Sequence, residues 1–99
     1  MATAQGVFDF LNAYIKKNPQ SKKSDWYVGI AADPKDRLFV GHSVDQANGI
    51  WAYEKADSNA IARQVEKAYH DAGYSGGPGG GDDKTIWVYA YVITSSTAE

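Results

Sequence analysis

The sequence predicts a small α/β domain of the α+β type, in which about three helices pack against a three-stranded sheet that is antiparallel or mixed. Helix-like and strand-like segments alternate along the chain, which indicates a sheet with helical connections. Residues 86–93 are apolar or aromatic at every position, as in a central strand covered on both faces. The connections 32–49 and 56–84 are long enough for crossovers, so this pattern leaves the strand directions open.

The first half of the chain contains two predicted helices and one strand. Apolar residues recur three and four positions apart over 6–17, which predicts an amphipathic helix that an Asn-Pro pair ends. After a polar loop, residues 26–31 alternate with the period of a strand. Asp33 is a suitable helix cap and Pro34 suits the first helical position, so we expect a short helix over about 34–40.

The second half contains a strand, a helix and the central strand. Residues 41–49 have the composition of a loop, and 50–55 are predicted to form a strand. The strongest helix pattern covers 58–72, where one apolar stripe is followed by a glycine that ends the helix. The Gly-rich stretch within 73–84 lacks the Gly-Lys-Ser/Thr ending of a phosphate-binding loop, so we expect a flexible connection.

Composition supports one folded domain over residues 1–99, with 1–5 and 95–99 frayed. Hydrophobic residues make up 43% of the chain and charged residues 22%, a balance typical of a folded protein. The chain has no cysteine, which excludes disulfides, thiolate metal sites and a cysteine nucleophile. It contains no membrane-length apolar run and no signal-peptide pattern, so we expect a cytoplasmic protein that does not associate with membranes.

One group of residues resembles a known enzyme family. The stretch Tyr27-Val28-Gly29, followed by a helix with Arg37 and then by His42, resembles the second half of the GIY-YIG nuclease motif. In that family a later helix carries a glutamate that binds a divalent metal, and Glu66 occupies this place. The resemblance covers about residues 26–70 and implies metal-dependent cleavage of nucleic acid.

The chain departs from the family pattern in two ways. No Gly-Ile-Tyr-like strand precedes Tyr27, and Arg37 and His42 are one residue farther apart than the family pattern implies. A circular permutation would explain the missing strand. The C-terminal strand would then take its central place in the sheet, and Tyr89 or Tyr91 would stand in for the first tyrosine of the motif. We take Tyr89 as the candidate.

The resemblance implies a separate catalytic or binding role for each of these side chains. Glu66 would hold Mg²⁺, which needs few carboxylates because it keeps several waters. Arg37 would bind two phosphate oxygens at once, while Tyr27 would orient or deprotonate the attacking water. His42 would transfer a proton. Lys35 would contact the substrate, a nucleic acid.

Two other functions compete with nuclease activity. A non-catalytic interaction domain of the same fold, such as an accessory phage or mobile-element protein with a protein partner, fits the absent first motif. It also fits the formal net charge of −2, because nucleic-acid binders usually carry a basic excess. A small-molecule site beneath the Gly-rich segment is a third alternative. Under the nuclease hypothesis we expect Tyr27, Arg37, His42 and Glu66 to converge on one open cleft, and the hypothesis fails if they point to separate surfaces.

Overall fold

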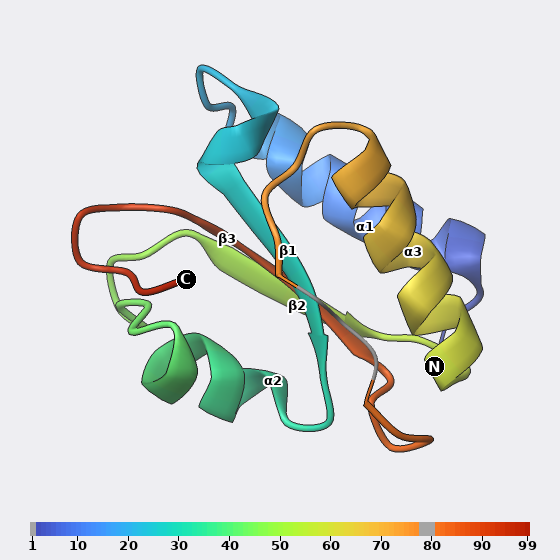
Figure 1. Cartoon of the computed structure of the whole chain (residues 1–99). Helices are drawn as coiled ribbons and strands as arrows, with labels where there is room; N and C mark the ends of the chain where they lie inside the picture. Colours follow the sequence, from blue (N-terminus) through green and yellow to red (C-terminus); the bar gives the residue numbers. More distant parts are fainter. Residues whose placement is uncertain (1, 78–80) are drawn as a thin grey trace.

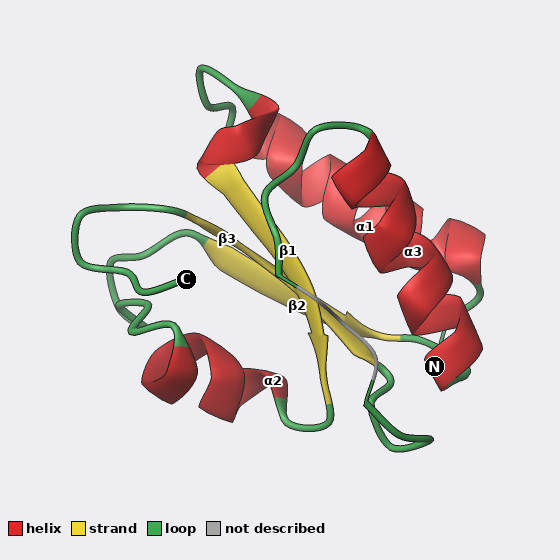
Figure 2. Cartoon of the chain, viewed as in Figure 1, coloured by secondary structure: helices red, strands yellow, loops and turns green. Residues whose placement is uncertain are grey.

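A computed structural model describes residues 2–77 and 81–99 of the chain, and Figures 1 and 2 show its architecture. The elements in chain order are α1 (Ala4–Lys17), the 3₁₀ turn η1 (Lys23–Asp25), β1 (Trp26–Ala31), α2 (Pro34–Asp36), the π-helical turn η2 (Arg37–Gly41), β2 (Trp51–Lys55), α3 (Asn59–Asp71) and β3 (Trp87–Val92). The short helix predicted after β1 is therefore divided between α2 and η2. Helix α1 starts two residues earlier than predicted, because the Thr3 side chain caps it by accepting a hydrogen bond from the Gly6 N–H.

The three strands form one sheet in the order β1-β3-β2, and both pairings are antiparallel. Strand β3 is central, which confirms the prediction from its unbroken apolar sequence. Its residue Tyr91 pairs with Tyr27 on one side and with Trp51 on the other. The fold is thus α+β with an antiparallel sheet, and the strand directions that the sequence pattern left open are settled.

The sheet separates two clusters of buried side chains. Helices α1 and α3 cover one face, where the strands contribute residues such as Val28 and Val88. Helix α2 and turn η2 cover the other face, where Tyr27, Tyr89 and Tyr91 lie. Because side chains alternate between the two faces of a strand, each strand supplies both clusters.

The outer edge of β1 is partly covered by the chain that follows α3. The Val28 N–H donates to the Ser75 carbonyl at 2.9 Å, and the Ser75 N–H donates to the Trp26 carbonyl at 2.9 Å. The His70 ring lies on the same edge, with its Nε2 atom 2.8 Å from the Val28 carbonyl oxygen. Ser75 is thus held in place, although it belongs to the segment predicted to be flexible. Residues 78–80 of that segment lie outside the described residues.

The described parts of both terminal segments are also held, where the sequence predicts frayed ends. The Ala2 N–H donates to the Lys55 carbonyl at 2.9 Å, so the chain before α1 extends the edge of β2. At the other end, the Ala98 N–H donates to the His42 carbonyl at 2.7 Å. These backbone hydrogen bonds join segments far apart in sequence, which the local composition does not reveal. No helix in the described residues is long and apolar enough to cross a membrane.

Candidate functional site

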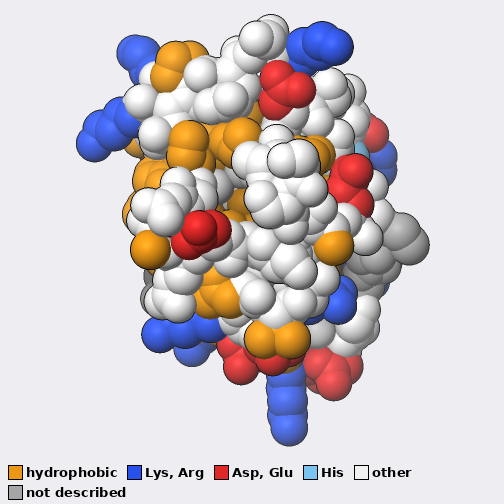
Figure 3. All heavy atoms as spheres, turned by 90° about the vertical axis from the view of Figure 1, so that its left-hand side faces the viewer, with side chains coloured by type: hydrophobic (Ala, Val, Ile, Leu, Met, Phe, Trp, Pro, Cys, Tyr) orange, Lys and Arg blue, Asp and Glu red, His pale blue; other side chains and the backbone are white. Residues whose placement is uncertain are grey.

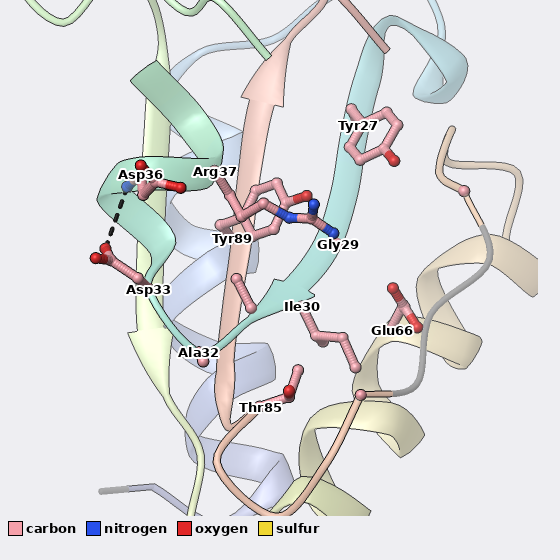
Figure 4. Close-up of a pocket in the computed structure, with 13 residues that line it drawn as sticks. Tyr27, Gly29, Ile30, Ala32, Asp33, Asp36, Arg37, Glu66, Thr85 and Tyr89 are labelled. Carbon is pink, nitrogen blue, oxygen red and sulfur yellow. Dashed lines mark hydrogen bonds between the residues drawn. The ribbon is translucent and has the colours of Figure 1, made fainter. Parts of the chain in front are cut away.

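A cleft of about 410 Å³ lies beside β1, between α2 with its continuation η2 and α3 (Figure 4). Its lining includes four of the residues proposed from the sequence: Tyr27, Arg37, Glu66 and Tyr89. These four come from β1, η2, α3 and β3, so only the folded chain brings them together.

Glu66 is the acidic group on the α3 side of the cleft. It is 8% exposed, and burial raises the pKa of its carboxyl, while the nearby His70 and Arg63 lower that pKa in part. Among residues 2–77 and 81–99, no hydrogen bond or ion pair reaches the Glu66 carboxylate. Because the carboxylate is partly buried at the edge of the cleft, its charged form is less favourable there than in water. A bound cation would offset that cost.

A magnesium site with one protein carboxylate fits this arrangement. Within the described part of the chain, no group of three or more His, Asp or Glu side chains is placed to surround a metal ion. Mg²⁺ is often held by one or two carboxylates together with waters and substrate phosphate. Glu66 supplies one carboxylate. Asp33 and Asp36 also line the cleft, on its opposite side.

Arg37 is the cationic group of the cleft and the first residue of η2. Its side chain is exposed, and Figure 4 shows the guanidinium reaching past the Tyr89 ring toward the side of the cleft where Tyr27 lies. No carboxylate in the described residues forms an ion pair with it. The guanidinium is therefore available to bind an anionic group such as a phosphate, which it can contact through two parallel hydrogen bonds.

Tyr27 and Tyr89 form the tyrosine pair of the cleft. Their rings are stacked, with centroids 6.3 Å apart and planes 17° apart. Burial raises the pKa of both phenols, while the Arg37 guanidinium lowers both pKa values only in part. Both hydroxyl groups are consequently protonated at neutral pH. Each can act as a base toward water only if it passes its own proton to another group.

Gly29 provides the space in which the Tyr89 ring lies. The two residues are paired across β1 and β3, and a β-carbon at position 29 would lie 2.5 Å from the Tyr89 hydroxyl oxygen. Any larger side chain at this position would displace the tyrosine. The close packing of the Tyr89 ring thus explains why the third position of the Tyr-Val-Gly motif is a glycine in this fold.

His42 lies behind the cleft, where it is not part of the lining. It is 7% exposed, and its Nε2 atom is 2.7 Å from the Tyr89 hydroxyl oxygen. Its ring also contacts that of Tyr27, with centroids 4.7 Å apart. The expectation that His42 shares the open cleft with the other three residues is therefore wrong. The structure places it one layer deeper, in contact with Tyr89.

The longer spacing between Arg37 and His42 coincides with the π-helical turn η2. The His42 N–H donates to the Arg37 carbonyl at 2.8 Å, which closes a turn one residue wider than that of an α-helix. The extra residue is accommodated within this turn. Arg37 and His42 therefore both lie next to Tyr89, one on the cleft side and one on the buried side.

Lys35 lies outside the cleft and lines a second pocket of about 380 Å³. The two pockets adjoin, because Ala32 and Asp33 line both of them. Tyr53 and Trp87 also line the second pocket, and their rings meet edge to face with centroids 5.5 Å apart. The structure therefore separates Lys35 from the group around Arg37 and places it beside partly exposed aromatic rings.

Charged and hydrophobic side chains are unevenly distributed over one face of the molecule. Figure 3 shows the face that carries α2 and the C-terminal segment, with hydrophobic side chains near its middle and Lys and Arg side chains near its edges. Val40 of η2 is 72% exposed and is one of the two large hydrophobic side chains that are exposed in the described residues. On this face the basic side chains thus lie apart from the hydrophobic ones, while the lining of the cleft combines one guanidinium with carboxylates.

Sequence reasoning missed the acceptor behind His42, which is the backbone carbonyl of Ala98. No side-chain pattern marks such a group.

Comparison of the chain with protein-family models, with curated proteins and with solved structures finds no match in any of the three. Function is therefore inferred from the cleft and its side chains.

Proposed function

We propose that this protein hydrolyses phosphodiester bonds in nucleic acid with the help of a divalent cation, Mg²⁺ by preference. One observation carries the proposal: Arg37, Glu66, Tyr27 and Tyr89 line one cleft, although they come from four separate elements. The cleft combines a cation for phosphate, a carboxylate for a metal and two phenols for a water molecule. These are the groups that hydrolysis of a phosphodiester requires.

Each side chain has a defined task in this proposal. Arg37 binds two non-bridging oxygens of the phosphate and stabilises the charge that develops there. Glu66 holds the metal ion, which when bound supplies charge neutralisation at the leaving oxygen. The position of the Glu66 carboxylate supports this task, because it lines the cleft, is largely buried and forms no ion pair within residues 2–77 and 81–99.

Tyr89 is better placed than Tyr27 to activate the attacking water. Its hydroxyl is 2.7 Å from the His42 Nε2 atom, and this ring can accept the phenolic proton. Tyr89 takes a proton from the water as it gives its own proton to His42. The water oxygen forms the new bond to phosphorus, the bond to the leaving oxygen breaks, and that oxygen takes a proton from solvent. Tyr27, whose ring stacks against that of Tyr89, orients the water.

The second pocket supports a nucleic-acid substrate. Tyr53 and Trp87 offer ring surfaces on which bases can stack, and Lys35 can pair with a backbone phosphate. Because this pocket adjoins the cleft through Ala32 and Asp33, one strand could occupy both. We further propose a cytoplasmic site of action, where nucleic acid and Mg²⁺ are both available.

The test is a cleavage assay on single-stranded, double-stranded and branched DNA and on RNA, with Mg²⁺ or Mn²⁺. We expect Glu66→Gln to abolish cleavage, because the amide lacks the charge that a hard cation requires. Glu54→Gln is the matched control, since it makes the same chemical change outside the cleft. Activity that survives Glu66→Gln would contradict the assignment. Inactivity of the wild type on every substrate would favour a non-catalytic interaction domain.

A further inference from the structure

The buried ring of His42 is held between Tyr89 and the segment that follows β3. Its Nε2 atom is 2.7 Å from the Tyr89 hydroxyl oxygen, and its Nδ1 atom is 2.7 Å from the Ala98 carbonyl oxygen. We infer that the Ala98 carbonyl fixes His42 in the tautomer that carries its proton on Nδ1. The Nε2 lone pair is thereby kept free to accept the Tyr89 proton, and Ala98 acts as a positioning residue.

The assignment follows from which groups can donate a hydrogen bond. A carbonyl oxygen only accepts, so a 2.7 Å contact with Ala98 requires a proton on Nδ1. A neutral imidazole has only one N–H group, so Nε2 must then be an acceptor. The Tyr89 hydroxyl, at 2.7 Å from Nε2, is therefore the donor. The opposite tautomer would set two lone pairs against each other at Ala98.

A compact turn brings Ala98 to this position. The Thr94 N–H donates to the Thr97 hydroxyl at 3.0 Å, and that hydroxyl donates to the Thr94 carbonyl at 3.0 Å. The next residue then makes two contacts with one partner: the Ala98 N–H donates to the His42 carbonyl at 2.7 Å, while its carbonyl faces the His42 ring. The segment is attached to both the backbone and the side chain of His42.

The consequence for catalysis rests on the proposed function. When Tyr89 gives its proton to Nε2, His42 becomes an imidazolium whose positive charge is shared with the Nδ1–H group. That group already donates to the Ala98 carbonyl, so the charge forms beside an acceptor that is in place. Without Ala98, the remaining partner of Nδ1 is the Tyr91 hydroxyl at 3.1 Å, which can donate to Nδ1 and so permits the other tautomer. Tyr89 then faces an N–H group that cannot accept its proton.

The first test is the tautomer itself, measured by ¹⁵N NMR of the imidazole in the full chain at pH 8. Spectra with and without His42→Gln identify its signals. We expect the Nδ1 atom of His42 to carry the proton and Nε2 to show the shift of an unprotonated nitrogen. A proton on Nε2 would overturn the inference. This measurement does not depend on any enzymatic activity, so it separates the inference from the proposed function.

The second test perturbs the segment. Deletion of residues 95–99 removes the Ala98 carbonyl, and we expect His42 to shift toward the Nε2–H tautomer, with kcat lower by about 10–100-fold. Ala98→Gly is the matched control, because it keeps the backbone amide and carbonyl. If this deletion fails to fold, deletion of residues 98–99 alone removes the same carbonyl and keeps the Thr94–Thr97 turn, and the same tautomer shift is expected. An Nδ1–H tautomer that persists in a folded deletion variant would show that Ala98 does not fix it.

Discussion

Beneath α1 and α3, the sheet is covered by a core built largely from aliphatic side chains such as Leu11, Val28 and Val88. Beneath α2 and η2, the same strands present aromatic rings, and the Tyr89 hydroxyl there is hydrogen-bonded to buried His42. The first core depends on filled volume, and its contacts have little directionality. The second depends on the orientation of a few polar atoms. The tyrosines and the buried histidine of the site thus lie on the aromatic face, while Glu66 reaches the cleft from α3, which covers the aliphatic face.

The largest change in stability should follow from a cavity in the aliphatic core. Leu11 is fully buried, so Leu11→Ala should lower the free energy of unfolding by about 2–5 kcal/mol. Urea denaturation measures this loss. The rings of the cleft lie on the other face, so the tautomer of His42 should be unchanged in the folded fraction. A changed tautomer would show that the two faces are not independent.

Gly29→Ala should disturb the aromatic face by overpacking. The new methyl group would meet the Tyr89 ring, so we expect a loss of about 1–3 kcal/mol in the free energy of unfolding. Displacement of Tyr89 should also separate its hydroxyl from His42 and abolish cleavage. Thermal unfolding and the tyrosine hydroxyl signals in NMR spectra measure the two effects. Gly41→Ala is a suitable control, because its nearest neighbour atom is 3.7 Å away.

Tyr89→Phe should cost no more stability than Gly29→Ala and should have a large effect on activity. It leaves the Nε2 atom of His42 without its buried partner, which should cost about 1–3 kcal/mol. Cleavage should fall by about 10²-fold or more, because the water loses its proton acceptor. Tyr91→Phe is the matched control: its hydroxyl contacts with His42 and Ala98 are longer, at 3.1 and 3.4 Å. Equal losses of activity in both variants would contradict the role of Tyr89.

Glu66→Gln should have the smallest effect on stability. Burial raises the pKa of Glu66 in the folded state, so its ionisation opposes folding as the pH rises through that pKa. The variant should therefore match or exceed the wild type in Tm at pH 7. The difference in Tm between the variant and the wild type should vanish when the pH falls below about 4.3, the pKa of a glutamate carboxyl in the unfolded chain. Added Mg²⁺ should raise the Tm of the wild type alone. A variant less stable than wild type at pH 7 would show that the carboxylate has a structural partner.

The sequence was sufficient for the elements whose patterns are local. Residues 26–31 were predicted as a strand with the bounds that β1 has, and the unbroken apolar run of β3 correctly indicated its central position. Strand direction was left open, because a long connection permits either direction. The terminal segments were predicted to be frayed, because their anchoring depends on backbone groups that every residue possesses.

The sequence predicted which residues form the candidate site, but it did not predict how deeply each one is buried. Arg37 and Glu66 were chosen because of the resemblance to a family motif, and both line the cleft. His42 was expected beside them, but a histidine that follows a glycine in a loop carries no local signal of burial. Its depth results from the width of η2 and from the ring of Tyr89, which lies 47 residues farther along the chain.

The order of strands in the sheet has a consequence for how the protein is made. Within the described part of the chain, β1 and β2 share no ladder with each other, and each pairs with β3. A ribosome synthesises β3 after both of its neighbours. The backbone groups of β1 and β2 that pair with β3 therefore stay without these partners until residue 92 has emerged. Open edges favour aggregation, so the nascent chain is most vulnerable just before β3 is completed. Both faces of the sheet then form together, and the cleft exists only after this last strand is in place.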